Sequence, residues 1–356
     1  MSTLNVSNLA GPSNTGTAAT LSSINGGPIA GSRNRLINGD MRIWQRGTTL
    51  NGMTPTLGVT AYTADRWFVS QLISQSSTDV SQQTGGATRF SVRVQKRAGS
   101  TGASANQLGQ VVENLNCLDL PGKQLTLTFT AKAGANYSAA GGALSVLIYT
   151  CTTADQSSTF FVNGIAAGQA TLYSGSVTLT ASNQTFSITT SAVAANATNI
   201  CVLFTENSSA SAAGANDWFE ISDVQIEAGT VATPFERRNY GAELALCQRY
   251  FVKYLGTALF EYPVTGPIIA TAPTAAYGAI YAPVEMRSAP SLSTSTIALS
   301  DQITTHTVTA TSFSSPYIGR YGGEVGFTTA GLTAFRTYIC RANNSTSAFV
   351  HLSAEL

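Results

Sequence analysis

The segment KQLTLTFTAKA, residues 123–133, decides the fold class of this chain. Its apolar residues Leu125, Leu127 and Phe129 alternate with threonines, so the apolar side chains share one face of an extended strand and the hydroxyls take the other. This pattern is typical of a half-buried antiparallel strand. Turn signals, PG at 121 and GG at 141, flank the segment and mark breaks in the sheet.

Similar short runs recur at a spacing of roughly ten residues, as in antiparallel β-proteins. They are RFSVRVQKR (89–97), LSVLIYTCT (144–152), SGSVTLTA (174–181), QTFSITT (184–190), ATNICVLFTE (197–206) and DWFEISDVQIEAG (217–229). Amphipathic helices do not alternate with these runs. The sequence therefore predicts a β-sandwich or jelly roll over residues 34–238 and disfavours a parallel α/β sheet.

One segment departs from the β pattern. In GAELALCQRYFVKYLG, residues 241–256, strong helix formers come first and a glycine ends the run, which predicts a short helical connector over residues 239–256. Strand-like runs resume in residues 257–356 and predict a second β-sandwich. The expected architecture is all-β: two tandem jelly-roll-like sandwiches, a short connecting helix and an extended N-terminal arm.

The predicted arm, residues 1–33, contains no aromatic residue and consists mainly of Gly, Ser, Thr, Asn and Ala with isolated aliphatic residues. Such a segment does not bury a core of its own. Two interpretations stay open. The segment is either a disordered tail or an attachment arm that becomes ordered against partner chains or a docking surface.

The composition excludes several classes of function. Charged residues make up 10% of the chain, against about 25% in an ordinary soluble domain, and the net charge is +1. Electrostatic binding of nucleic acid is therefore not expected. There is no apolar stretch of about 20 residues and no secretion signal, so we expect no membrane insertion and release by lysis. The 5 cysteines lack CxxC spacing, which predicts buried free thiols formed in a reducing cytoplasm.

Four blocks of sequence carry a resemblance to a known group of proteins. They are RNRLINGDMRIWQRG (33–47), YTADRWF (62–68), FEISDVQIEAGTVATPFERRNYGAELALCQRYF (219–251) and APVEMRSAPSLS (282–293). In order and spacing these blocks resemble recurrent segments of phage tail-fibre and related virion structural proteins. The stretches INGD and ISDVQIEAG also resemble the first and last strands of carbohydrate-binding-module jelly rolls.

The resemblance implies a bacteriophage virion protein, made in the host cytoplasm and acting as a homotrimer. As a tail fibre or receptor-binding protein, it would attach to other virion proteins through its N-terminal arm and recognise host cell-surface polysaccharide. The alternative is a purely structural role as a capsid decoration, collar or tail-assembly protein. Neither role requires a cofactor or an enzymatic activity.

Carbohydrate-binding jelly rolls often hold a structural calcium between their first and last strands, through carboxylate and carbonyl oxygens. Asn38, Asp40 and Asp223 occupy comparable contexts in this sequence and are the candidate ligands that the resemblance implies. The other interpretation is that Asp40 caps or hydrogen-bonds a turn.

Signals for catalysis are weak. The two histidines, His306 and His351, lack metal-ligand spacing, and no nucleophile-elbow or phosphate-loop motif is present. Glycan hydrolysis requires two positioned carboxylates. The acids near the end of the first domain are Asp217, Glu220, Asp223 and Glu227, and Glu220 projects to the face opposite the other three. We therefore expect no enzyme, and we interpret these acids as the solvated face of a terminal strand, with a hydrolytic fibre as the alternative.

Residues 314–324, SSPYIGRYGGE, form the best candidate for glycan recognition. Tyrosines give flat, amphipathic contact surfaces, and an arginine offers several donors to sugar hydroxyls or carboxylates, so Tyr317, Arg320 and Tyr321 are the predicted glycan-binding residues. A tight hairpin whose aromatic residues cover a sheet edge is the alternative. The tryptophans Trp44, Trp67 and Trp218 are likewise open between sugar stacking and core packing.

Overall fold

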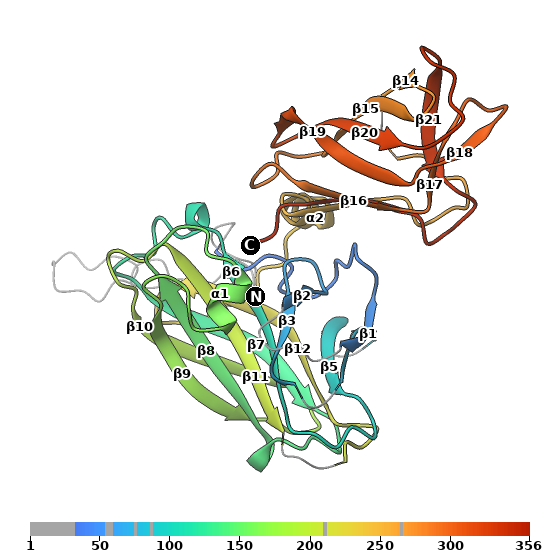
Figure 1. The fold of residues 1–356 in the computed structure, drawn as a ribbon. Coiled ribbons are helices and arrows are strands. Elements are labelled where there is room, and N and C mark those ends of the chain that lie inside the picture. Colours follow the sequence, from blue (N-terminus) through green and yellow to red (C-terminus); the bar gives the residue numbers. More distant parts are fainter. Residues whose placement is uncertain (1–32, 54–59, 75–76, 86–87, 209–211, 264–265) are drawn as a thin grey trace, which may run out of the picture.

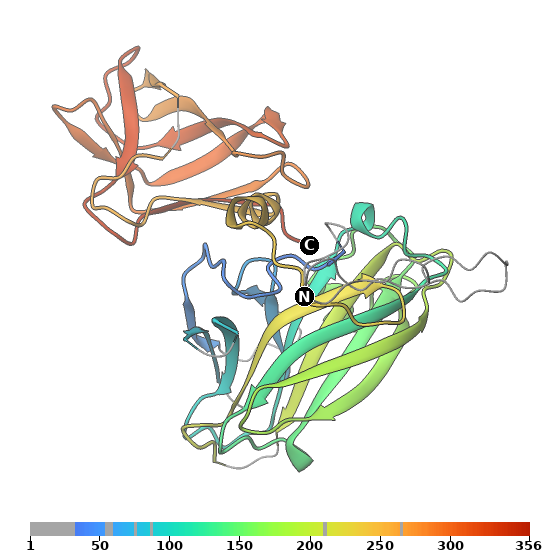
Figure 2. The same ribbon diagram turned by 180° about the vertical axis from the view of Figure 1, so that it is seen from behind.

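The computed structural model describes residues 33–53, 60–74, 77–85, 88–208, 212–263 and 266–356. It has two all-β lobes, with helix α2 (Tyr240–Gln248) lying between them (Figures 1 and 2). Apart from Arg33, the predicted arm lies outside the described residues. The described helices include none that is long and apolar enough to cross a membrane.

The first lobe is a sandwich of two six-stranded antiparallel sheets. In spatial order, one sheet consists of β1 (Thr49–Met53), β4 (Thr78–Thr84), β5 (Phe90–Lys96), β12 (Trp218–Ala228), β7 (Gln124–Ala133) and β10 (Gln184–Ala192). The other consists of β2 (Thr60–Tyr62), β3 (Phe68–Ser74), β6 (Ser104–Val112), β11 (Asn199–Ser208), β8 (Ala143–Cys151) and β9 (Ala170–Thr178). Sequential hairpins and long crossovers both contribute, as in jelly rolls.

Strand β7 shows why this sequence forms a sandwich. Leu125, Leu127 and Phe129 are fully buried between the sheets. The Phe129 ring packs on Phe204 of the opposite sheet, with ring centroids 4.8 Å apart. The other face of β7 is more buried than its threonines predict, because the chain after β12 crosses it and the carbonyl oxygen of Gly229 accepts a hydrogen bond from Thr126 at 2.8 Å.

The second lobe packs a three-stranded sheet against a seven-stranded one. The smaller sheet consists of β13 (Phe251–Tyr254), β22 (Phe349–Ser353) and β16 (Ser291–Ser295). The larger consists of β18 (Thr305–Thr307), β17 (Ile297–Ser300), β21 (Thr337–Ala342), β14 (Ile268–Ala272), β15 (Ala275–Tyr281), β20 (Gly322–Thr328) and β19 (Ala310–Gly319). Ile268, Ile280 and Val325 are among the fully buried residues of its core.

The connector is only half helical. Helix α2 ends at Gln248, and Phe251–Tyr254 forms strand β13, which pairs with β22. The prediction of a helical connector over residues 239–256 was therefore too long. Aromatic and β-branched residues favour an extended strand when a partner edge is available, and β22 supplies that edge.

Part of the outer face of the β2–β9 sheet is covered by the junction between the lobes. The short helix α1 (Ser158–Val162), α2 and the last residue of the chain all pack there. The buried apolar contacts include Phe68, Leu203, Tyr250 and Leu356. Polar contacts also cross the junction, since Arg249 pairs with Glu113 at 2.6 Å. Apolar contacts and an ion pair therefore both join the two lobes.

Candidate functional site

The predicted recognition segment is a β-hairpin. Tyr317 lies in β19, and Arg320 and Tyr321 form the two-residue turn into β20, with Gly319 paired opposite Gly322. Gly322 has a φ of +101°, and a Cβ at this position would lie 2.2 Å from the Ile280 carbonyl oxygen, so the turn requires glycine. The segment is therefore a hairpin, and its two tyrosines, Tyr317 and Tyr321, are both exposed.

The three predicted glycan-binding residues do not converge. Tyr317 is 66% exposed and lines a surface groove. The Arg320 guanidinium is turned to the neighbouring loop, where Nη1 pairs with Glu285 at 2.6 Å and Nε donates to the Met286 carbonyl oxygen at 3.0 Å. Tyr321 is exposed, but it is not among the residues that line the groove. Only Tyr317 therefore stays in the candidate site.

The groove lies on the outer face of the seven-stranded sheet and has a volume of about 850 Å³. Strand β15 supplies its centre. Ala276 and Ile280 point into the core, so Tyr277 and Tyr281, which have the opposite parity, point to solvent and are 41% and 56% exposed. Tyr277 is paired with Gly326, where a Cβ would lie 3.4 Å from the tyrosine ring, so the absence of a side chain leaves room for that ring.

Apolar surface and hydroxyl groups line this groove, with one charge. Ile269 of β14, opposite Tyr277, is 48% exposed and adds an apolar wall. Thr271 and Glu324 supply polar groups in the lining. Open, mainly apolar hollows with a few polar groups are the usual form of a ligand site. Half-exposed tyrosine rings present both a flat face for stacking and a hydroxyl for hydrogen bonding.

Sequence reasoning missed Tyr277, Tyr281 and Glu324. Strand-like runs were expected in residues 257–356, but the outward face of AAYGAIY, residues 275–281, was not assigned. The signal was the alternation itself. Once Ile280 is placed in the core, period-2 geometry places both tyrosines on the solvent face.

The first sandwich carries a second, more polar hollow of about 390 Å³. It lies on the outer face of the β6, β11, β8 and β9 strands, and its lining includes Gln107, Ser145, Ser174, Thr205 and Asn207. Gln107 is buried, and its Nε2 donates to Thr205 at 3.3 Å. The lining carries no charged or aromatic side chain, so it lacks the stacking surface of the tyrosine groove.

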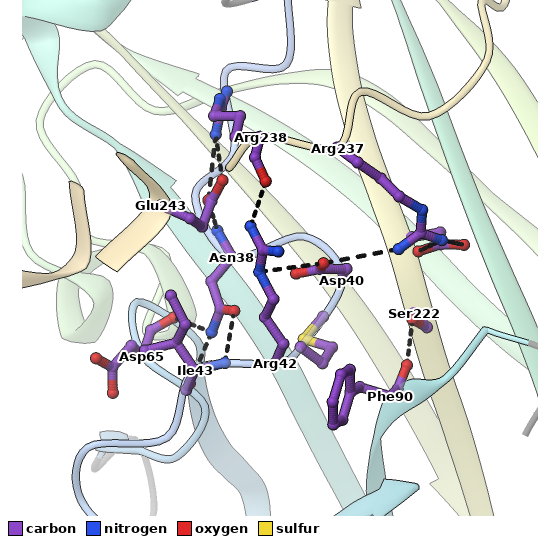
Figure 3. Close-up of polar contacts among 12 residues, drawn as sticks. Asn38, Asp40, Arg42, Ile43, Asp65, Phe90, Ser222, Arg237, Arg238 and Glu243 are labelled. Atoms are coloured by element: carbon purple, nitrogen blue, oxygen red, sulfur yellow. Dashed lines mark hydrogen bonds and ion pairs between the residues drawn. The ribbon is translucent and has the colours of Figure 1, made fainter. Parts of the chain in front are cut away.

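Asn38, the first calcium candidate, closes a loop (Figure 3). Its Oδ1 accepts a hydrogen bond from the backbone nitrogen of Ile43 at 3.0 Å, and its Nδ2 donates to the carbonyl oxygens of Ile43 and Asp65 at 2.9 and 3.1 Å. The side-chain oxygen that a metal would need is therefore directed at the backbone. Trp67 adds to this loop by donating to the Asn38 carbonyl oxygen at 3.0 Å.

Asp40 and Asp223 are bridged by an arginine. The Arg237 guanidinium lies 3.0 Å from Asp223. It also lies 3.7 Å from Asp40, and Arg42 lies 3.3 Å from Asp40 on the other side (Figure 3). Burial raises the pKa of both carboxyls, and the arginines oppose that rise. The three candidate residues do not fit a calcium site, because a guanidinium occupies the place of the cation. The described residues include no group of three or more His, Cys, Asp or Glu side chains arranged for a metal.

Two further acids, Glu220 in β12 and Asp217 directly before it, are engaged in structural contacts. Glu220 pairs with Arg93 at 2.6 Å and Lys132 at 3.2 Å. Asp217 accepts hydrogen bonds from the backbone and hydroxyl of Ser138 at 2.9 and 2.7 Å. These carboxylates form ion pairs and hydrogen bonds within the first sandwich.

The tryptophans and histidines also have structural neighbours. Trp67 is fully buried in the core, and the Trp218 ring lies under the Arg93 guanidinium at 4.0 Å. His351 stacks on Phe349 with ring centroids 4.0 Å apart, and burial lowers its pKa to about 4. His306 contacts the Ala330 carbonyl oxygen at 2.9 Å.

Comparison with known proteins gives only distant similarity. No protein-family model matches the chain, and no curated protein matches it by sequence. Among solved structures, the enzymatically active domain of tailspike protein 4 of bacteriophage CBA120 is similar over 55% of this chain and 22% of that one, with 13% identity and a TM-score of 0.34.

Binding modules for carbohydrates are similar at the same level. The structure of TmCBM61 in complex with beta-1,4-galactotriose matches 56% of this chain and 100% of that one, with 14% identity and a TM-score of 0.31. The N-terminal cellulose-binding domain of a Cellulomonas fimi beta-1,4-glucanase matches 47% of this chain and 90% of that one, with 17% identity and a TM-score of 0.29. Scores and identities of this size carry no inference about function, which must come from the residues of this chain.

Proposed function

We propose that this chain is a bacteriophage tail fibre or receptor-binding protein that recognises host surface glycans through the tyrosine groove of its second sandwich. The resemblance of the four sequence blocks supports the phage role, and one observation supports glycan recognition. Tyr277, Tyr281 and Tyr317, from two strands, expose their side chains around a single hollow. Large aromatic side chains are normally buried, and an exposed cluster of them marks a binding surface.

The chemistry of the groove suits a saccharide. A pyranose ring has an apolar C–H face and a rim of hydroxyls. Tyrosine rings offer flat apolar area at a small cost in conformational entropy, because each has only two side-chain torsions. Thr271 and Glu324 supply hydrogen-bonding groups in the same lining. An open groove also allows an extended polymer to lie along it.

The groove favours binding over hydrolysis. Hydrolysis of a glycosidic bond normally requires two carboxyl groups about 5–10 Å apart. Glu324 is the only carboxylate among the residues that line this groove. The proposed protein is therefore a binding component, and an assay for new reducing ends after incubation with host polysaccharide is expected to show none.

The proposed assembly follows from the weakness of a single open site. One shallow groove gives modest affinity, and three copies on a homotrimer raise the overall avidity by a large factor. In this proposal residues 1–33 attach the trimer to other virion proteins, and the groove meets the cell surface.

The proposal is tested with purified protein and polysaccharide prepared from cells that the phage infects. Retention on the polysaccharide that is competed by soluble glycan supports it. Absence of retention, under conditions in which whole phage adsorbs, counts against it. Labelled antibody on intact particles gives the location, and a position on the collar or capsid would support the structural alternative.

A further inference from the structure

We propose that the groove selects glycans that carry an ammonium group, such as amino sugars, and that Glu324 is the residue that selects them. This inference rests on the proposed recognition of glycans at the same groove. It adds the chemical class of the ligand and a specificity-determining residue. The supporting observations are the pairing of charges in the second sandwich, the register of its strands and the orientation of Arg320.

Glu324 differs from the other side-chain carboxylates of the second sandwich in having no hydrogen-bond or ion-pair partner among the described side chains. The other four have partners: Glu261 accepts from the Thr257 backbone nitrogen at 2.8 Å, Glu285 pairs with Arg320 at 2.6 Å, Asp301 pairs with Arg336 at 3.0 Å, and Glu355 pairs with Arg46 at 3.1 Å. Glu324 has no hydrogen bond or ion pair to any described side chain. It is also the one charged residue in β14, β15, β19 and β20, which are described throughout.

The register of the strands places this carboxylate among the rings. Glu324 of β20 is directly opposite Ala279 of β15. Tyr277 and Tyr281 are the residues two before and two after Ala279, so they are its diagonal neighbours on the same face, at about 7–8 Å. On the other side, a Cβ on Gly323 would lie 2.1 Å from the Tyr317 carbonyl oxygen, so β19 passes close to this point. The carboxylate and three tyrosines therefore share one hollow.

An ammonium group fits this combination better than a neutral or acidic one. The faces of aromatic rings carry negative potential and attract cations, and a carboxylate adds a charge-assisted hydrogen bond. An acidic sugar would be repelled by Glu324. Arg320, the nearest arginine in sequence, is held by Glu285 and the Met286 carbonyl oxygen and so does not neutralise the groove.

The test compares two oligosaccharides of equal length that differ in charge. The intact chain is titrated calorimetrically with the β-1,4-linked tetramer of glucosamine and with the tetramer of N-acetylglucosamine, at a mildly acidic pH that protonates the amines. We expect the glucosamine tetramer to bind about tenfold more tightly. Glu324→Gln keeps a hydrogen-bonding side chain of the same shape, so it should abolish this preference while leaving binding of the acetylated tetramer. Glu261→Gln removes a charge outside the groove without releasing an arginine, so it should keep the preference.

Equal affinity of the wild type for both tetramers would overturn the inference, as would a preference that persists in Glu324→Gln. Failure of both tetramers to bind would also overturn it. These results differ from a failure of the proposed function. Retention of a host polysaccharide that depends on Tyr277 but not on Glu324 would preserve glycan recognition and reject ammonium selection.

Discussion

Arg66 and Glu355 form a buried ion pair that joins the first sandwich to the end of the second. Arg66 is 2% exposed, and its Nη2 also donates to the Val111 carbonyl oxygen at 2.7 Å. Its guanidinium lies 3.6 Å from the centroid of the Tyr250 ring. The arginine therefore has partners in both lobes and is one of the residues that hold the two sandwiches together.

Glu355→Ala should destabilise the junction strongly. The substitution leaves the Arg66 charge buried without its partner, and the loss from breaking a buried pair is about 3–5 kcal/mol. Chemical denaturation, monitored for both lobes, measures it. Lys123→Ala removes a partner from the exposed pair with Asp119 and should cost about 1 kcal/mol or less. Equal losses in the free energy of unfolding for the two variants would show that the junction pair contributes no more to stability than a surface ion pair.

The core of the first sandwich depends on Phe129. Its ring contacts Phe186 and Phe204, with centroids 5.2 and 4.8 Å away. Phe129→Ala should lower the free energy of unfolding by about 3–5 kcal/mol, because it removes buried area and leaves a cavity. Phe335→Ala, at a position 85% exposed, is the matched control and should change it by less than about 0.5 kcal/mol. A Phe129 variant as stable as this control would contradict the observed packing.

The stability of the first sandwich should depend on pH through Glu206. Burial raises the pKa of this carboxyl from 4.5 to about 7. The folded state then holds a proton that the unfolded state releases, so stability falls as pH rises from about 4.5 to 7 and is level above that range.

Glu206→Gln should flatten this part of the pH profile. The variant keeps an acceptor for the Asn106 amide, which donates to Glu206 at 2.9 Å. It should gain roughly 3 kcal/mol over the wild type at alkaline pH and little at acidic pH. Denaturation curves across the range measure the difference. Parallel profiles for the two proteins would mean that Glu206 ionises normally when folded.

Chelation should not affect the loop at Asn38, Asp40 and Asp223. Arg237 bridges the two aspartates, so we expect the midpoint of thermal unfolding to be the same in EDTA and in excess calcium. Differential scanning calorimetry gives the comparison. A midpoint that falls in EDTA and recovers with calcium would restore the calcium hypothesis.

Local pattern predicted most of the fold because the relevant signal is short-range. The run at residues 123–133 became β7, and the run at 197–206 became β11 (Asn199–Ser208). The predicted helical connector was too long. Phe251–Tyr254 forms a strand because it pairs with β22, which lies about a hundred residues later in the chain. The junction between the lobes was not predicted for the same reason: alternation identifies which residues are buried but not by which distant segment.

The site was only partly predictable. The glycine-rich stretch around Tyr317 identified this tyrosine correctly as a groove residue. Arg320 was predicted from the same stretch, but its guanidinium is turned to Glu285. Side-chain direction in a two-residue turn is set by contacts with another loop, which the sequence does not display. Tyr277 and Glu324 are diagonal neighbours because β15 pairs with β20 so that Glu324 lies opposite Ala279. This pairing joins residues that are far apart in the chain.

The most direct test of glycan recognition is retention of the purified protein on cells to which the whole phage adsorbs, measured for three single variants. Tyr277→Ala and Tyr317→Ala remove rings from the groove, and Tyr321→Ala removes a tyrosine of intermediate exposure outside the groove lining. We predict that the first two variants lose about tenfold or more in affinity, as hot-spot aromatic residues do, and that the third binds like the wild type. Wild-type binding that survives both groove substitutions, or no binding by the wild type, would contradict the account.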